Sequence, residues 1–270
     1  MLYILLLGLC AGSFVNAWIW RTHKNLKSKN NSKKYSIITG RSVCVDCGHQ
    51  LHARDLIPVV SWLSLGGKCR YCKKPISKQY PIVEVATAAI FVGSYLFWPV
   101  ELNSFDTWYA FILWLAVLPS LITLFIFDLK WYLLPNTIIY PTILFIGMAT
   151  TIQLIFLKTD TNFFNVLLAA GVGGGIFQVL FTLSKGKWIG GGDVKLGYLL
   201  GILCLTPLRA MEAILIASLL GCIFVLPAII TKKLAFASKI QFGPFLILGT
   251  AIIVIWGQWL TDWYLSLFNL

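Results

Sequence analysis

The sequence predicts an all-α polytopic membrane protein, with about eight transmembrane helices and a small cytoplasmic zinc-binding loop domain between the first two. Three observations predict this fold class. Hydrophobic residues make up 58% of the 270 residues and charged residues only 12%, against roughly 25% charged in an average soluble domain. Apolar runs of about 20 residues, long enough to cross a bilayer, recur along the chain. One long polar segment, residues 21–80, interrupts these runs and contains two C-x2-C pairs.

The apolar runs define the expected transmembrane helices and the domain boundaries. The first run should be a retained helix rather than a cleaved signal peptide, because its positive charges, Arg21 and Lys24, follow the apolar residues. The expected domains are a first transmembrane helix over 1–20, a cytoplasmic domain over 21–80 and a transmembrane domain over 81–270. The predicted spans are 2–20, 82–99, 107–127, 136–157, 163–183, 194–208, 211–230 and 243–264.

The distribution of basic residues predicts the orientation in the membrane. Residues 21–80 contain 13 of the 22 Lys and Arg residues. Because these residues collect in cytoplasmic loops, we place this segment inside the cell. The formal net charge of +12 then reflects this bias and favours contact with anionic membrane lipids. We therefore expect a multi-pass protein of the cytoplasmic membrane with no nucleic-acid partner.

The polar segment contains a predicted metal site. Thiolates in two C-x2-C pairs, here separated by 21 residues, can close a tetrahedral structural Zn²⁺ site. Two disulfides or four free thiols are the alternatives, and a reducing cytosol argues against the disulfides. His49 and His52 could each replace a cysteine as ligand, or be solvated loop residues. The expected ligands are Cys44, Cys47, Cys69 and Cys72.

Two of the ten acidic residues lie where a predicted span meets the cytosolic face, namely Asp128 in FIFDLKWYLLPN and Asp193 in GGGDVKL. Either alone could be an ordinary interfacial acid beside a lysine, Lys130 or Lys195. Together they stand at one depth on one side of the predicted topology, which favours a shared site. Glu84 lies one turn into the second predicted span, where an ionised group is costly and needs a partner or a lipid-edge position.

Two groups of glycines close to the predicted spans indicate places where helices pack closely together. Gly190–Gly192 precede Asp193 directly and allow a close backbone approach, so we expect them to bring Asp193 against Asp128. A second group, AAGVGGG, has the small-xxx-small form of helix packing, with Gly171 and Gly175 on one face.

A shared site for two carboxylates predicts aspartic-protease chemistry. Two such groups cannot both ionise easily, so one keeps its proton. The ionised partner can take a proton from water while the other polarises the scissile carbonyl, and the pair titrates as a unit. A membrane transporter would also have buried acids, but its discontinuous helices normally come from repeated halves, which are not found here. A membrane-anchored zinc module would explain the cysteines and leave the two aspartates unexplained.

Motifs along nearly the whole chain resemble those of the bacterial type IV prepilin peptidases, which are GxGD-type intramembrane aspartic proteases. LLGLCAGSFVNAWIWR is similar to the first helix of that family, the two C-x2-C pairs to its cytoplasmic loop, and KPISKQYPIVE to the entry of its second helix. DLKWYLLPN and GGGDVKLG resemble its two aspartate motifs, and QFGPFL its late inner-face motif. One departure is Asn136, where many members have Asp.

The resemblance implies an aspartic endopeptidase with Asp128 and Asp193 as its catalytic pair. It would cut the basic leader of type IV prepilins or pseudopilins after a glycine, at the cytosolic face of a bacterial cytoplasmic membrane. Members with the cysteine loop commonly also methylate the new N-terminus from S-adenosylmethionine. The resemblance identifies neither the residues that would bind this methyl donor nor an oligomeric state.

Overall fold

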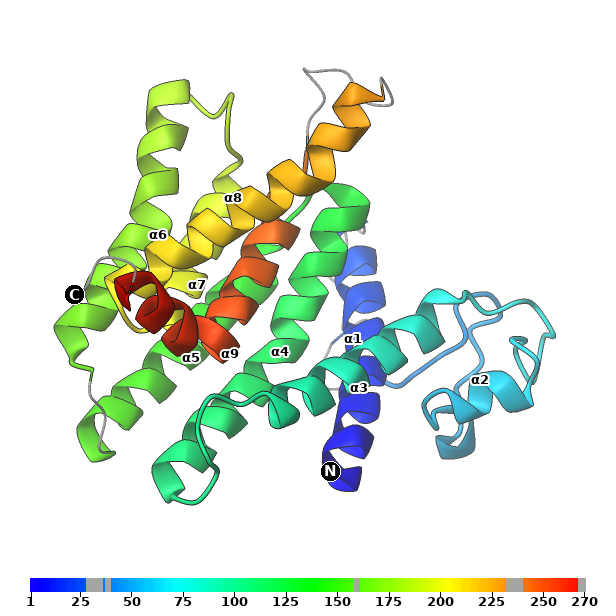
Figure 1. Ribbon diagram of the computed structural model, residues 1–270. Helices are drawn as coiled ribbons and strands as arrows, with labels where there is room; N and C mark the ends of the chain where they lie inside the picture. Colours follow the sequence, from blue (N-terminus) through cyan, green and yellow to red (C-terminus); the bar gives the residue numbers. More distant parts are fainter. Residues whose placement is uncertain (28–35, 37–39, 158–160, 232–239, 267–270) are drawn as a thin grey trace. The chain divides into compact units, whose positions relative to one another are not determined.

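The computed structural model describes residues 1–27, 36, 40–157, 161–231 and 240–266 (Figure 1). These residues form nine α-helices and one 3₁₀ helix, with two isolated β-bridges and no strand among them. The all-α fold class is therefore confirmed. The chain divides into two compact units, Met1–Leu96 and Phe97–Leu270. The domain boundaries expected near residues 20 and 80 stay a prediction.

The first unit contains α1 (Leu2–Lys27), η2 (Ala53–Asp55), α2 (Val60–Ser64) and α3 (Gln79–Leu96). Glycines allow α1 and α3 to pack closely, because a side-chain carbon on Gly12 would lie 2.6 Å from the Cα of Glu84. One turn further along α1, Asn16 Nδ2 donates to the backbone carbonyl of Tyr80 at 3.0 Å. Residue numbers at these contacts increase along α1 while they decrease along α3, so the two helices are antiparallel. The polar segment between α1 and α3 thus begins and ends at one end of a helical pair.

The described residues of the second unit form six helices. Their bounds are α4 (Phe105–Trp131), α5 (Asn136–Phe156), α6 (Phe163–Ser184), α7 (Gly191–Cys204), α8 (Pro207–Ile230) and α9 (Gly243–Ser266). The short helix α7 contacts α5, α6, α8 and α9 (Figure 1). Its inward face contributes Leu196 and Leu199, which are fully buried. The residues at the start of α7 are therefore held at the centre of this unit.

Glycines join α6 to α7, although not the ones that the sequence pattern indicated. The expected packing face of Gly171 and Gly175 is wrong, because a side-chain carbon at either position would meet no described atom within 4 Å. Gly173 makes the close approach instead, and a side-chain carbon there would lie 2.9 Å from the Cα of Gly201. Gly197 lies one turn before Gly201 on the same face of α7 and also faces Gly173. The spacing pattern identified the right helix but the wrong face.

Six helices among the described residues are long and apolar enough to cross a membrane, namely α1, α4, α5, α6, α8 and α9. The protein is therefore a membrane protein, as the composition predicts. The two remaining predicted crossings are also helical, as α3 with 18 residues and α7 with 14. At 1.5 Å per residue they are about 27 and 21 Å long, less than the roughly 30 Å of a hydrocarbon core. That α3 and α7 cross the bilayer stays a prediction.

Candidate active site and metal centre

The first predicted carboxylate, Asp128, is buried in the last turn of α4. The helix ends at Tyr132, whose left-handed backbone (φ 52°) allows its N–H to donate to the Asp128 carbonyl at 2.9 Å. At the other end, the Ser104 side chain caps α4 by accepting from the Thr107 N–H at 3.3 Å. Both ends of α4 are thus defined, which fixes the position of Asp128 on a rigid helix.

The second predicted carboxylate, Asp193, lies in the first turn of α7, directly after the glycine run. Gly190 is the N-cap residue, and its N–H donates to the Asp193 carboxylate while its carbonyl accepts from the Asp193 N–H at 3.1 Å. A side-chain carbon on Gly192 would lie 3.0 Å from Leu134 Cβ, in the α4–α5 connection. The glycine run therefore lets the start of α7 approach the segment that follows Asp128.

The two predicted carboxylates lie within electrostatic range of each other in the second unit. An electrostatic interaction joins Asp128 and Asp193, which are 65 residues apart in the sequence. Asp128 Oδ2 is buried, and no donor among the described residues reaches it in hydrogen-bond geometry. A buried carboxylate oxygen without a donor is costly when ionised. Two carboxylates placed in this way cannot both ionise easily, so one of them keeps its proton.

A third residue of this site, Gly243, was not identified from the sequence. It is the first residue of α9, and a side-chain carbon there would collide with Asp128 Oδ2. Gly243 comes to lie beside Asp128, which is 115 residues earlier in the sequence, through tertiary packing. The only local signal was a Gly-Pro step in the QFGPFL motif, where an apolar segment begins. Glycine at this position leaves the Asp128 carboxyl group its space.

Lys195 does not make the local ion pair that the sequence offered as an alternative. Its Nζ donates to Asn136 Oδ1 at 2.9 Å and lies 5.4 Å from the ring centroid of Tyr140. Both partners are on α5, so this contact ties α7 to α5. Asn136, the position that departs from the family pattern, thus supports the site by a neutral acceptor.

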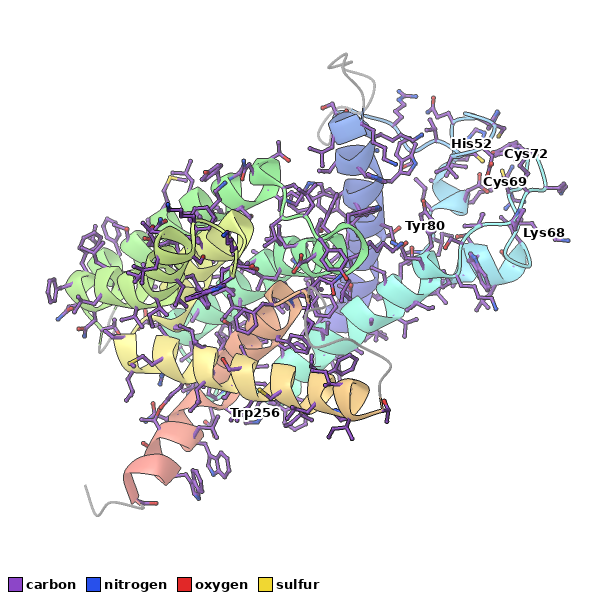
Figure 2. The ribbon with its side chains drawn as sticks, turned by 90° about the horizontal axis from the view of Figure 1, so that it is seen from above. His52, Lys68, Cys69, Cys72, Tyr80 and Trp256 are labelled. Carbon is purple, nitrogen blue, oxygen red and sulfur yellow. The ribbon has the colours of Figure 1, made fainter. Side chains whose placement is uncertain are left out.

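The four predicted metal ligands meet in one group in the first unit. Their ligand atoms all lie within 4.8 Å of one another, and Cys44 Sγ is 3.9 Å from Cys72 Sγ. A tetrahedral site with Zn–S bonds of about 2.3 Å has sulfur–sulfur distances of about 3.8 Å. The set therefore fits a tetrahedral metal ion and could hold one. Figure 2 shows Cys69 and Cys72 in this loop region. The group consists of Cys44, Cys47, Cys69 and Cys72.

The two C-x2-C turns have the same backbone structure. In each, the N–H of the first cysteine donates to the carbonyl five residues later at 2.9 Å, and its carbonyl accepts from the N–H four residues later at 3.0 Å. The residue after the second cysteine has a left-handed backbone, with φ 70° at Gly48 and 59° at Lys73. An isolated β-bridge closes each turn. Two equivalent turns that present their thiols to one point are typical of a structural zinc site.

The histidines offered as alternative ligands are not part of this group among the described residues. The His49 ring stacks on Tyr71, with 3.7 Å between ring centroids, and so connects the two turns. Tyr71 donates to Asp55 Oδ2 at 3.0 Å, and Arg70 Nε donates to Asp55 Oδ1 at 2.7 Å. Burial disfavours the charged form of Asp55, but these hydrogen bonds outweigh it and hold the pKa of that carboxyl below its usual value. Asp55 therefore anchors the second turn to η2.

The thiols differ in how readily they ionise. The backbone N–H of Cys72 lowers the pKa of the Cys69 thiol to about 7. Burial raises the pKa of the Cys44 thiol to about 11. A metal ion binds thiolates and displaces their protons, so it would overcome the unfavourable ionisation of Cys44. The donor set thus favours a thiophilic divalent metal over ligand-free thiols.

Comparisons with known proteins match both units. Residues 6–98 match the sequence model of the bacterial peptidase A24 N-terminal domain, and residues 115–226 match that of the type IV leader peptidase family. A prepilin leader peptidase/N-methyltransferase of Pseudomonas aeruginosa is 32% identical over 98% of this chain and 93% of the relative. A protein with the same name from Stutzerimonas stutzeri is 28% identical over 98% of this chain and 94% of the relative. Another from Bacillus subtilis is 28% identical over 86% of this chain and 88% of the relative. No solved structure matches the chain.

Proposed function

The chain belongs to the type IV leader peptidase family, and from this premise we propose that it is an aspartic prepilin endopeptidase with Asp128 and Asp193 as its catalytic pair. The observation that supports this pair is that two carboxylates on separate helices, α4 and α7, lie within electrostatic range of each other. Gly243 lies beside both the Asp128 carboxyl group and Leu196 of α7. Two carboxylates that share a site do not ionise together easily, so one can serve as acid and the other as base.

In the proposed reaction one acid begins ionised and the other protonated, and we assign the base to Asp193 and the acid to Asp128. The Asp193 carboxylate takes a proton from a water molecule, whose oxygen then attacks the scissile carbonyl carbon. Asp128 gives its proton to the carbonyl oxygen, and a tetrahedral diol forms. When the diol collapses, the C–N bond breaks and the leaving nitrogen takes the proton from Asp193, while one hydroxyl proton returns to Asp128. Both residues regain their starting states, and one water molecule has been consumed.

The proposed substrates are type IV prepilins or pseudopilins, cleaved after a glycine at the cytosolic face of a bacterial cytoplasmic membrane. The curated relatives support this class, because their shared name is prepilin leader peptidase. A basic leader would be repelled by a chain of formal charge +12. Recognition by the apolar helix of the pilin, bound between helices of the enzyme, is therefore the more favourable mode.

We further propose a structural Zn²⁺ at the four cysteines and N-methylation of the new N-terminus from S-adenosylmethionine. The sulfur geometry supports the metal, and the word N-methyltransferase in the names of the relatives supports the second activity. When bound, S-adenosylmethionine supplies an electrophilic methyl group. This methyl group would be transferred to the new N-terminal amine, whose proton would pass to solvent.

Cleavage of a purified prepilin by the detergent-solubilised chain tests the peptidase proposal. We expect a mature product whose first residue directly follows a glycine, identified by intact mass and N-terminal sequencing. A prepilin that remains uncleaved with the folded, metal-containing chain would contradict the proposal.

A further inference from the structure

The first unit encloses a cavity of about 320 Å³ that the peptidase mechanism does not use. Its lining comes from the middle of α1 (residues 13–21), the cysteine turns, α2 and the first turns of α3. Cys44 and Cys69 form part of one wall, and Tyr80 from α3 lines another part (Figure 2). The volume is at the lower end of the roughly 300–1,000 Å³ of small-molecule sites. The cavity is therefore large enough for a compact small molecule and borders the metal centre.

Aromatic side chains give the cavity its flat, apolar surfaces. Trp20, Trp62 and Tyr80 all line it. The Trp62 indole is fixed, because its Nε1 donates to the Ile76 carbonyl at 3.3 Å. Gly67 lies against this ring, and a side-chain carbon there would be 2.8 Å from Trp62 Cζ2. A fixed indole can stack on a planar heterocycle and attract a cation to its face.

The charged groups of the cavity are unusual for an apolar pocket. The side chain of Asp55 is 3% exposed and Glu84 is 6% exposed, yet both line the cavity. Glu84 Oε2 accepts from the Val59 N–H at 2.7 Å, which fixes the carboxylate at the wall. Arg21, also buried, donates to the Gly40 carbonyl at 3.0 Å and lines the same cavity. Asp55 is paired with Arg70, which also lines the cavity. Glu84 and Arg21 remain as buried groups of opposite charge, and they favour a ligand that carries charges of both signs.

We infer that this cavity is the binding site of the methyl donor S-adenosylmethionine, an inference that rests on the proposed N-methylation. The purine suits the aromatic walls, and the sulfonium is attracted to the carboxylates and to aromatic faces. The ribose hydroxyls suit carboxylate acceptors, and the methionine carboxylate suits the guanidinium of Arg21. A lipid acyl chain suits the cavity poorly, because it would leave the charged side chains of Glu84 and Arg21 facing hydrocarbon.

Direct binding of radiolabelled S-adenosylmethionine to the full-length, metal-containing protein tests the inference by equilibrium dialysis. Ser61 and Ser64 lie on the short helix α2, but only Ser61 lines the cavity, whereas Ser64 is exposed. We expect Ser61→Phe to fill the space and weaken binding about tenfold or more, and Ser64→Phe to stay within about twofold of the wild type. Metal content and circular dichroism of both variants verify the fold. Equal affinity of the two folded variants would overturn the inference.

A second measurement uses the wild-type protein and needs no variant. Ultraviolet crosslinking of the radiolabelled donor, followed by peptide mass spectrometry, should label a peptide that contains Trp62 or Tyr80. Labelling confined to residues 97–270 would overturn the inference. Absence of saturable binding by a chain that cleaves prepilin would also overturn it, and would leave the peptidase proposal standing. Donor binding at the cavity without methylation of the mature product would support the site and contradict the proposed methyl transfer.

Discussion

Replacing either proposed catalytic aspartate by asparagine should abolish prepilin cleavage without loss of folding. Asparagine keeps the shape of the side chain and one carbonyl-type acceptor, so at position 193 it can still accept from the Gly190 N–H. At position 128 the substitution removes a carboxylate whose Oδ2 has no donor among the described residues. Either change also removes the electrostatic interaction between the two acids. We therefore expect unchanged or slightly higher thermal stability in both variants.

The loss of activity should be large. Positioned acid–base groups contribute roughly 10²–10⁴-fold each, and neither residue can act without the other. A fall of about 10³–10⁴-fold in the cleavage rate corresponds to about 4–5.5 kcal/mol of transition-state stabilisation. Because Asp128 and Asp193 would act as one unit, the double variant should be no slower than the slower single variant. Losses that simply multiply in the double variant would argue for independent roles.

The assay is cleavage of a detergent-solubilised prepilin, followed by gel mobility and intact mass, with each variant quantified and its melting temperature measured. Glu212→Gln is the matched control, since it makes the same carboxylate-to-amide change in the same unit. Glu212 accepts from the Thr261 hydroxyl at 3.0 Å, a contact that glutamine can keep. The control should cleave at close to the wild-type rate. Substantial turnover by Asp128→Asn or Asp193→Asn would refute the two-aspartate mechanism.

Three further predictions concern the other parts of the two units. Gly243→Ala should slow cleavage about tenfold or more, because the added methyl group would displace the Asp128 carboxyl group. Gly147→Ala is the control, since position 147 on α5 faces open space and the change should leave the cleavage rate unaltered. Equal cleavage rates of the two variants would contradict the role given to Gly243. Metal analysis of the reduced protein should find about one zinc per chain. Cys69→Ser should increase proteolysis within residues 44–72 with little loss of helical content. A wild-type protein without zinc would contradict the proposed metal site. Mature product should be about 14 Da heavier when S-adenosylmethionine is present, and an unmodified N-terminus after full cleavage would leave only the peptidase.

The sequence predicted the helices well, because each is a contiguous apolar run. The expected span 136–157 is Asn136–Phe156 in the structure, and 163–183 is Phe163–Ser184. The largest error at a single helix end is in the first helix, where the expected span 2–20 continues as helix to Lys27. The end of an apolar run marks the edge of the membrane, whereas a helix continues as long as its backbone hydrogen bonds do.

The contacts between helices were harder to predict than the helices themselves. The two acids and four cysteines were identified because few residues of these types occur in suitable places in this chain. The packing glycines of α6 were assigned to the wrong face, since a spacing pattern does not show which face meets a neighbour. The contact between Gly243 and Asp128, and the cavity of the first unit, depend on segments far apart in the chain. No local pattern encodes such distances.

The shortness of α7 has a consequence for the supply of water to the reaction. A helix of 14 residues falls about 9 Å short of a hydrocarbon core of typical thickness. Its C-terminus leads within three residues into α8, so α7 cannot slide far along the membrane normal. If α7 crosses the bilayer as predicted, local thinning of the membrane at so short a crossing would bring headgroups and water toward its end. With Asp193 in the first turn of α7, hydration would then reach the carboxylates from the lipid–water boundary itself, without a pore through the protein.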